Sequence, residues 1–285
     1  MDIKLTQNQQ PERVESINKL ALLKHCAFAG QCFKPTFAKY MRSIGYAWVY
    51  ADYLRNLQNH FSEPIPALSD PTEKGQFSNI VGRGLADYFA MKLDNVLFTF
   101  NYEAVMRLLN MSIKGRRPDL IGITKDNGIY AIEAKGYACE ATNNHIRNAV
   151  IQFQTGPVPI NASIASISHS LYIETKCRYT KTKPNAIATI DQTQSANLIK
   201  AYYKGISSLF DISRNDKRFT IRNCSFYKLP LFDKPTDLFN DCRISILLPD
   251  IMDNIESEHF VVISYEIIDE QNLYISRDGI GLCID

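Results

Sequence analysis

The sequence predicts an α/β protein with a mixed sheet flanked by helices, a helical region before the sheet and a β-rich part after it. Three observations predict this class. Between residues 78 and 176 the apolar pattern changes from helical to strand-like, then to helical and strand-like again. An Asn-Gly pair at 127–128, a strong hairpin signal, separates two of the strand-like runs. The chain has 285 residues, 45% of them hydrophobic, which suffices for one core with two appended parts.

We expect three regions along the chain. They are a helical region at 1–75, the core at 76–183, and a helix followed by a β-rich acidic region at 184–285.

The N-terminal region is expected to be helical over residues 11–62. Apolar residues recur at helical spacing in the stretch 13–30, and the stretch 35–61 continues this pattern with Pro35 near a helix start. Residues 63–75 contain three prolines, which predicts a linker or surface loop before the core.

The core is expected to alternate helices with strands. Its first helix is amphipathic and its second and third strands are joined by the turn Lys125–Gly128, whose Asn-Gly pair tolerates positive φ. The expected elements are a helix at 78–94, strands at 95–103, 118–124 and 128–137, a helix at 142–154, a strand at 165–176 and a basic loop at 177–184.

The C-terminal region is expected to contain one helix and several strands. The helix is expected at 195–210, and the strands at 218–229, 243–249, 259–268 and 273–284.

Charge is unevenly distributed along the chain, although the net charge is only +2. Residues 1–230 contain 29 Lys and Arg against 18 Asp and Glu, a balance of +11, whereas residues 231–285 contain 3 against 12, a balance of −9. The basic body suits a polyanion, which the acidic end would repel. Two solvated surfaces of opposite sign are the alternative interpretation.

The cysteine pattern and the apolar runs indicate a cytoplasmic protein without membrane contact. No apolar run approaches the roughly 18 residues of a membrane span, and the N-terminus lacks the apolar stretch of a signal peptide. The seven cysteines are odd in number and form no CxxC, which favours reduced thiols over a disulfide framework. His25, Cys26 and Cys32 lie close together but match no zinc spacing.

Charged residues interrupt one of the expected core strands. Glu133 and Lys135 are two residues apart, so their side chains share one face, and the hairpin brings Asp119 of the preceding strand close to them. Burying three charges without a task is costly, and carboxylate oxygens are the ligands that Mg²⁺ prefers. A lysine beside them can orient a water or stabilise charge on a phosphate, so the set suits hydrolysis of a phosphodiester. The alternative is a surface hairpin with a weak ion pair between Glu133 and Lys135.

The pattern Pro118-Asp119, thirteen residues, then Glu133-Ala134-Lys135 resembles the motif of the PD-(D/E)XK nuclease superfamily, over roughly residues 76–180. The resemblance implies a restriction-endonuclease-like fold and hydrolysis of DNA that depends on Mg²⁺ or Mn²⁺. It implies that Asp119 and Glu133 bind the metal and that Lys135 takes part in the chemistry. A protein that keeps this fold without activity is a further interpretation.

The resemblance also points to supporting residues outside the motif. Glu103 follows a core strand and is a candidate metal ligand, with Asp87 on the preceding helix as its competitor. Gln152 matches a glutamine that helps to hold the catalytic site in RecB-like members of the superfamily. Those members carry a tyrosine four residues later, where this chain has Gly156, which puts a RecB-like assignment in doubt.

Two basic groups flank the charged strand. Both are expected to contact phosphates without reading sequence, and solvated surface groups are the alternative. The first comprises Lys114, Arg116 and Arg117, and the second comprises Arg178, Lys181 and Lys183.

The function expected from these observations is a metal-dependent endonuclease that acts on DNA. A nucleic-acid-binding module without catalysis, and a nuclease acting on RNA or branched DNA, are the open alternatives. The expected partners are DNA and, as a further option, a second copy of the chain.

Overall fold

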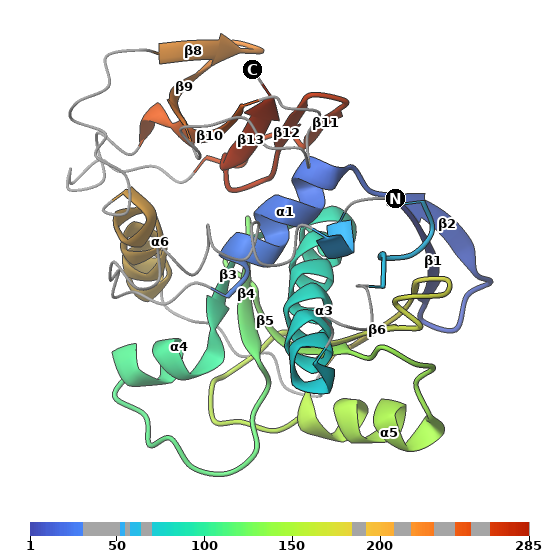
Figure 1. The fold of residues 1–285 in the computed structure, drawn as a ribbon. Helices are drawn as coiled ribbons and strands as arrows, with labels where there is room; N and C mark the ends of the chain where they lie inside the picture. Colours follow the sequence, from blue (N-terminus) through green and yellow to red (C-terminus); the bar gives the residue numbers. More distant parts are fainter. Residues whose placement is uncertain are drawn as a thin grey trace.

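The protein is a mixed α/β structure with two sheets (Figure 1). The computed structural model describes residues 1–30, 52–54, 58–63, 70–183, 192–207, 218–230, 243–251 and 263–284. Among the described residues, none of the helices combines the length and the apolar character that crossing a bilayer requires.

The larger sheet has seven strands in the order β2-β1-β7-β6-β5-β4-β3. It is mixed, because β1 runs parallel to β7 and β5 runs parallel to β6, whereas the other neighbours are antiparallel. Its strands are β1 (Asp2–Gln7), β2 (Arg13–Ser16), β3 (Val96–Asn101), β4 (Leu120–Thr124), β5 (Ile129–Gly136), β6 (Ala162–His169) and β7 (Lys176–Thr182).

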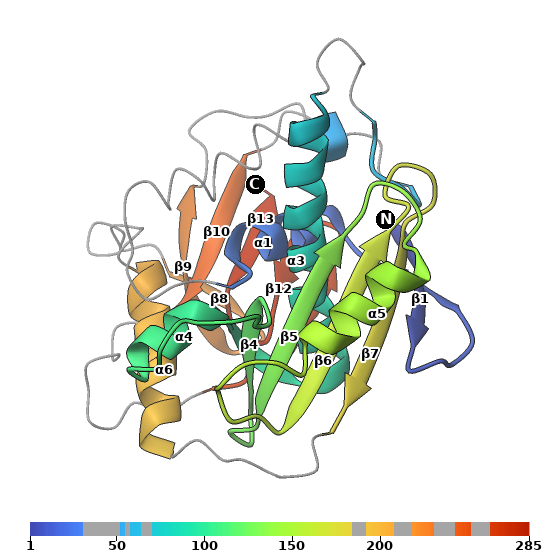
Figure 2. The same cartoon turned by 90° about the horizontal axis from the view of Figure 1, so that it is seen from below.

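Helices cover both faces of this sheet (Figure 2). Helix α3 packs on β5 and β6 from one side, α5 packs on the same strands from the other, and α4 lies against β3 and β4. Helix α1 packs on α3, and α6 contacts β3. The helices are α1 (Lys19–Phe28), α3 (Pro71–Asp94), α4 (Tyr102–Leu108), α5 (Asn143–Gln152) and α6 (Gln192–Ser207), with a 3₁₀ turn, η1, at Asp52–Leu54.

The second sheet is antiparallel and contacts α1 through β12 and β13. This part of the chain bears out the expectation of a β-rich C-terminal region. Its six strands, in the order β11-β12-β13-β10-β9-β8, are β8 (Arg218–Ile221), β9 (Cys224–Pro230), β10 (Ile244–Pro249), β11 (Ile268–Glu270), β12 (Leu273–Ile275) and β13 (Gly281–Ile284).

The N-terminal region is only partly helical, so the expectation of helix from residue 11 onward is wrong at its start. β1 and β2 extend the larger sheet, and Ile3 and Leu5 of β1 are fully buried. Asn18 caps α1, and its side chain accepts from the backbone N–H groups of Leu20 and Ala21. Most of the helix expected at 35–61 lies outside the described residues.

Several other boundaries differ from the expectation. The strand expected at 165–176 ends at His169, and residues 263–267 of the strand expected at 259–268 are not in a strand. The stretch 177–184, expected to be a basic loop, supplies most of β7, because Cys177 and Tyr179 are buried between β6 and β1. The stretch 63–75, expected to be a linker, contains the start of α3, where Asp70 caps the helix and Pro71 occupies its first turn.

Small residues let α3 approach the end of β5 very closely. A Cβ atom on Gly82 would overlap the backbone at Lys135 and Gly136, and one on Gly136 would overlap the Ser78 carbonyl. The backbone that carries Lys135 is therefore held from behind by a long helix, which limits how far this strand end can move.

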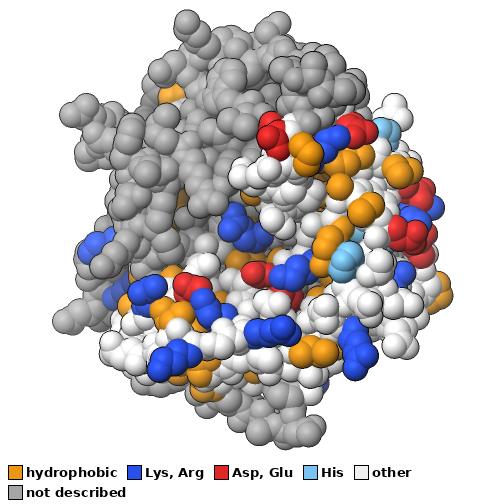
Figure 3. All heavy atoms as spheres, turned by 60° about the horizontal axis from the view of Figure 1, so that its bottom comes forward, with side chains coloured by type: hydrophobic (Ala, Val, Ile, Leu, Met, Phe, Trp, Pro, Cys, Tyr) orange, Lys and Arg blue, Asp and Glu red, His pale blue; other side chains and the backbone are white. Residues whose placement is uncertain are grey.

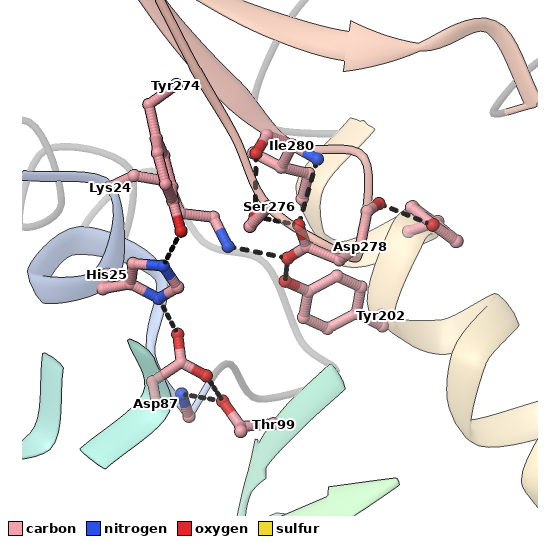
Figure 4. A network of polar contacts seen from close by, with 11 residues as sticks. Lys24, His25, Asp87, Thr99, Tyr202, Tyr274, Ser276, Asp278 and Ile280 are labelled. Atoms are coloured by element: carbon pink, nitrogen blue, oxygen red, sulfur yellow. Dashed lines mark hydrogen bonds and ion pairs between the residues drawn. The ribbon is translucent and has the colours of Figure 1, made fainter. Parts of the chain in front are cut away.

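A buried polar network ties α1 to α3 and to the second sheet (Figure 4). Lys24 donates to Asp278 at 2.9 Å, and both side chains are fully buried. The His25 ring lies between Asp87, 2.6 Å from Nδ1, and the Tyr274 hydroxyl, 2.6 Å from Nε2. Burial lowers the pKa of His25, which makes the neutral ring the stable form, with Nδ1 donating to Asp87. The acidic C-terminal region is therefore built into the packed structure through Asp278.

Candidate active site

The site is positioned by the hairpin of β4 and β5. The hairpin forms as expected, although only Asn127 of the Asn-Gly pair has a positive φ, at 56°. The Thr124 N–H donates to the Gly128 carbonyl at 2.9 Å and closes the turn. The ladder pairs Leu120 with Ile132, which sets Asp119 opposite Glu133 one position further along. The Ala134 N–H donates to Asp119 Oδ2 at 3.0 Å, which fixes that carboxylate at the strand end.

Asp119, Glu133 and Lys135 converge on the face of the sheet that α5 covers. In the ladder Lys135 pairs with Ile167, which packs against Ala149 of α5. Lys135 Nζ lies 2.5 Å from Glu133 Oε1 and 3.7 Å from Asp119 Oδ2. The Glu133 side chain is 0% exposed, whereas those of Lys135 and Asp119 are 29% and 39% exposed. One ammonium therefore faces two carboxylates at the rim of a buried strand.

The electrostatics of Glu133 are unusual for a surface-connected acid. Burial, with the neighbouring Asp119 carboxylate, raises its pKa to about 8 against the pull of Lys135. The pKa of Lys135 is raised although burial would lower it, because Asp119 and Glu133 favour the charged ammonium. Within the described residues, neither Glu133 oxygen accepts a hydrogen bond of normal geometry. The raised pKa of Glu133 reflects burial and repulsion from the Asp119 carboxylate, and a bound cation would offset both.

A surface pocket of about 280 Å³ opens beside Asp119. Asp119 itself forms part of its wall. The polar side chains that line it are those of Asn101, Glu103, Arg116, Arg117, Asp119 and Gln152.

Glu103 lies in this pocket but is engaged by a neighbour. It sits in the first turn of α4, where it forms an ion pair with Arg117. In the described part of the chain, no group of three or more His, Cys, Asp or Glu side chains is arranged to hold a metal. The structure therefore brings Asp119 and Glu133 together without placing Glu103 in the same ligand group. Its competitor Asp87 belongs to the buried network and also accepts from the Thr99 hydroxyl at 2.6 Å.

Gln152, at the C-terminal end of α5, holds the segment that precedes Asp119. Its Nε2 donates to the Arg117 carbonyl at 2.8 Å. Gly156, where RecB-like proteins carry a tyrosine, has a φ of 118°, and a Cβ there would overlap the Tyr102 hydroxyl. A tyrosine therefore cannot occupy position 156 in this fold, whereas Gln152 does reach the site loop.

The first basic group lies next to the site. Lys114 and Arg116 are exposed, and Arg117 is half-buried between Glu103 and the Gly115 carbonyl, which it reaches at 2.9 Å. On the face that Figure 3 brings forward, Lys and Arg side chains surround a few Asp and Glu side chains.

The second basic group is divided by the alternation of β7. Arg178 pairs with Ile167 in the ladder and so shares the face of Lys135, two strands away. Lys181 points to the opposite face, where it pairs with Asp94 and lies 4.5 Å from the centre of the Tyr130 ring. Lys183 is exposed at the end of this part of the structure. Of these two strand residues, Arg178 lies on the same face of the sheet as the site, whereas Lys181 lies on the other face and forms an ion pair with Asp94.

Sequence reasoning missed an aromatic pair beside Lys135. Tyr137 stacks on His145 of α5, with 4.3 Å between the ring centres and 9° between the planes. Burial raises the pKa of the Tyr137 hydroxyl, and nearby Lys135 opposes that effect. The available signal was its position two residues after Lys135, on the same side of the strand.

The fold and the site define an α/β protein whose mixed sheet presents two acids and a lysine at the end of a hairpin. No family model matches the chain, and neither curated proteins nor solved structures give a significant match.

Proposed function

We propose that the protein is a metal-dependent nuclease that hydrolyses phosphodiester bonds of DNA. The observation that carries the proposal is the convergence of Asp119, Glu133 and Lys135 within ion-pair distance at one strand end. A surface ion pair would not need a fully buried Glu133 or a third charged group. The resemblance of this pattern to the PD-(D/E)XK motif agrees with the proposal.

Asp119 and Glu133 are the residues that would hold a divalent cation. The fit is supported by the buried Glu133 carboxyl group, neither oxygen of which accepts a hydrogen bond of normal geometry within the described residues, and by the preference of Mg²⁺ and Mn²⁺ for carboxylates. A bound cation would supply Lewis-acid stabilisation of phosphate charge and a more acidic bound water. Since the pKa of Glu133 is about 8, binding near neutral pH would release a proton.

Lys135 would act on the reacting groups. Its ammonium stays charged because both carboxylates favour it, so it is suited to orienting a water or stabilising charge on a phosphate oxygen. Gln152 is a positioning residue in this scheme, because it acts through the Arg117 carbonyl and the loop before Asp119.

The proposal is tested by incubating the protein with circular, linear, single-stranded and branched DNA and with RNA, in Mg²⁺, in Mn²⁺ and in EDTA. Asp119→Asn and Glu133→Gln should abolish cleavage. Asp126→Asn, which changes an exposed acid at the opposite end of the same hairpin, should cleave as the wild type does. Cleavage that survives EDTA, or equal activity in all three variants, would contradict the proposal. Metal-independent binding without any cleavage would favour a nucleic-acid-binding module.

A further inference from the structure

We infer that the pocket beside Asp119 binds one unpaired nucleotide of the substrate strand, an inference that rests on the proposed nuclease function. The substrate would then be single-stranded, or have a base out of the stack, next to the bond that is cleaved.

The pocket lies directly beside the charged cluster. Asp119 belongs both to its wall and to the group that Lys135 completes. A nucleotide in the pocket would therefore lie adjacent to the phosphate that reaches Asp119 and Lys135. Its volume of about 280 Å³ is near the lower end for small-molecule sites, which suits a single nucleotide unit.

The walls of the pocket combine amide, guanidinium and carboxylate groups. The pocket is lined by two amide residues, Asn101 and Gln152, by two arginines, Arg116 and Arg117, and by Glu103. Such groups pair with base edges, since arginine donates to purine acceptors, amides pair with adenine, and a carboxylate accepts from exocyclic amines. These edges are accessible in a pocket only when the base is unpaired.

The pocket has no net formal charge. Arg116 and Arg117 are balanced by Glu103 and Asp119, so the formal charges cancel. A pocket built only for phosphate would carry excess positive charge. This pocket therefore favours recognition by hydrogen bonding and stacking over simple phosphate capture.

The two arginines of the pocket differ in how firmly their side chains are held. Arg117 is held by Glu103, by the Gly115 carbonyl and through its own carbonyl by Gln152. Arg116 is exposed and no ion pair or hydrogen bond engages its guanidinium within the described residues. Arg117 would thus form a fixed wall, and the Arg116 guanidinium plane would be the group that closes over a base and stacks on it.

The experiment measures binding rather than cleavage, with wild-type full-length protein in EDTA. The probes are a short fluorescent single-stranded DNA, the RNA of the same sequence, the blunt DNA duplex, and that duplex with one bulged nucleotide. Arg116→Ala is compared with Lys114→Ala, because both remove one exposed cation from the same loop but only Arg116 lines the pocket.

The expected result is that the single strands and the bulged duplex bind at least about tenfold more tightly than the blunt duplex. Arg116→Ala should weaken binding of the bulged duplex by about 5- to 150-fold, the range for loss of one stacked base, and the loss should persist at high salt. Lys114→Ala should cause a smaller loss that disappears at high salt. Comparison of the DNA and RNA strands shows which sugar the site accepts.

Equal losses in the two variants, or a blunt duplex that binds as well as the bulged one, would overturn the inference. Both outcomes are compatible with metal-dependent cleavage and leave the nuclease proposal standing. Tight, Arg116-dependent binding of unpaired strands without cleavage in Mg²⁺ would instead support the pocket and refute the nuclease.

Discussion

Glu133 should make the protein less stable as pH rises through the neutral range. The folded protein holds the Glu133 proton up to a pKa of about 8, whereas the unfolded chain releases it near the ordinary value of 4.5. Between these values the folded state binds more protons than the unfolded state, so stability falls by up to about 1.36 kcal/mol per pH unit. Integrating this dependence from about pH 5 to about pH 8 gives a loss of about 3–4 kcal/mol.

The substitution Glu133→Gln isolates this effect, because glutamine keeps the shape of the side chain and does not titrate. Other groups titrate in both proteins, so the quantity to follow is the difference in unfolding free energy between variant and wild type. That difference should shift by about 3–4 kcal/mol in favour of the variant between about pH 5 and about pH 8. The effect of Lys135 on Glu133 is already contained in the raised pKa of Glu133 and needs no separate correction.

The assay is urea unfolding in EDTA at a series of pH values, followed by circular dichroism. Asp126→Asn serves as the matched control, since its exposed carboxylate should give a pH-independent difference. Added Mg²⁺ at a hundredfold excess over its dissociation constant should stabilise the wild type by about 2.7 kcal/mol but not Glu133→Gln. Parallel stability curves for Glu133→Gln and the wild type from pH 5 to pH 8 would refute the assignment of a raised pKa to Glu133.

The contacts around the site and in the core determine the effect of three further substitutions. Lys135→Ala should bind Mg²⁺ and DNA but cleave about 10²–10³-fold more slowly in single-turnover experiments. Lys135→Arg should not restore the rate, because a planar guanidinium cannot replace a compact ammonium. Near-normal cleavage by Lys135→Ala would remove this lysine from the mechanism. Gln152→Ala should lower the cleavage rate with little change in the unfolding free energy. The control Asn148→Ala, which changes an exposed amide one turn earlier on α5, should alter neither quantity. A drop in stability without a change in rate would make Gln152 purely structural. Lys24→Ala should destabilise the protein by about 3–5 kcal/mol, because it leaves the buried Asp278 carboxylate without a counter-ion. Thermal unfolding of this variant close to that of the wild type would contradict this expectation.

The sequence determined the local features that create the candidate site. The Asn-Gly turn, the apolar runs beside it and the alternation along residues 129–136 were sufficient to predict a hairpin. Once the hairpin is fixed, its register brings Asp119 opposite Glu133 and leaves Lys135 on the same face. These relations depend only on residues close together in the chain, and the structure contains them.

Elements that depend on distant partners were not determined in this way. β1 and β7 are separated by more than 160 residues, and their parallel pairing buries Ile3, Leu5 and Cys177 in one sheet. Read alone, β7 is rich in basic residues and has few apolar ones, which favours a loop. Val14 of β2 fits a helical period although it is 62% exposed. Strand formation there is stabilised by contacts that local spacing cannot reveal.

The roles of individual charges were decided by the tertiary structure. The sequence offered Glu103 and Asp87 as competing acids, and packing gave Glu103 to Arg117 and Asp87 to His25. It offered Arg178 and Lys181 as one basic group, and the alternation of β7 sent them to opposite faces. A charged side chain acts through whatever lies within a few ångströms, and burial multiplies that effect, as the raised pKa of Glu133 illustrates. The sequence by itself therefore determined which chemical groups meet at the hairpin, and only the tertiary structure decided which other charges remain free to join them.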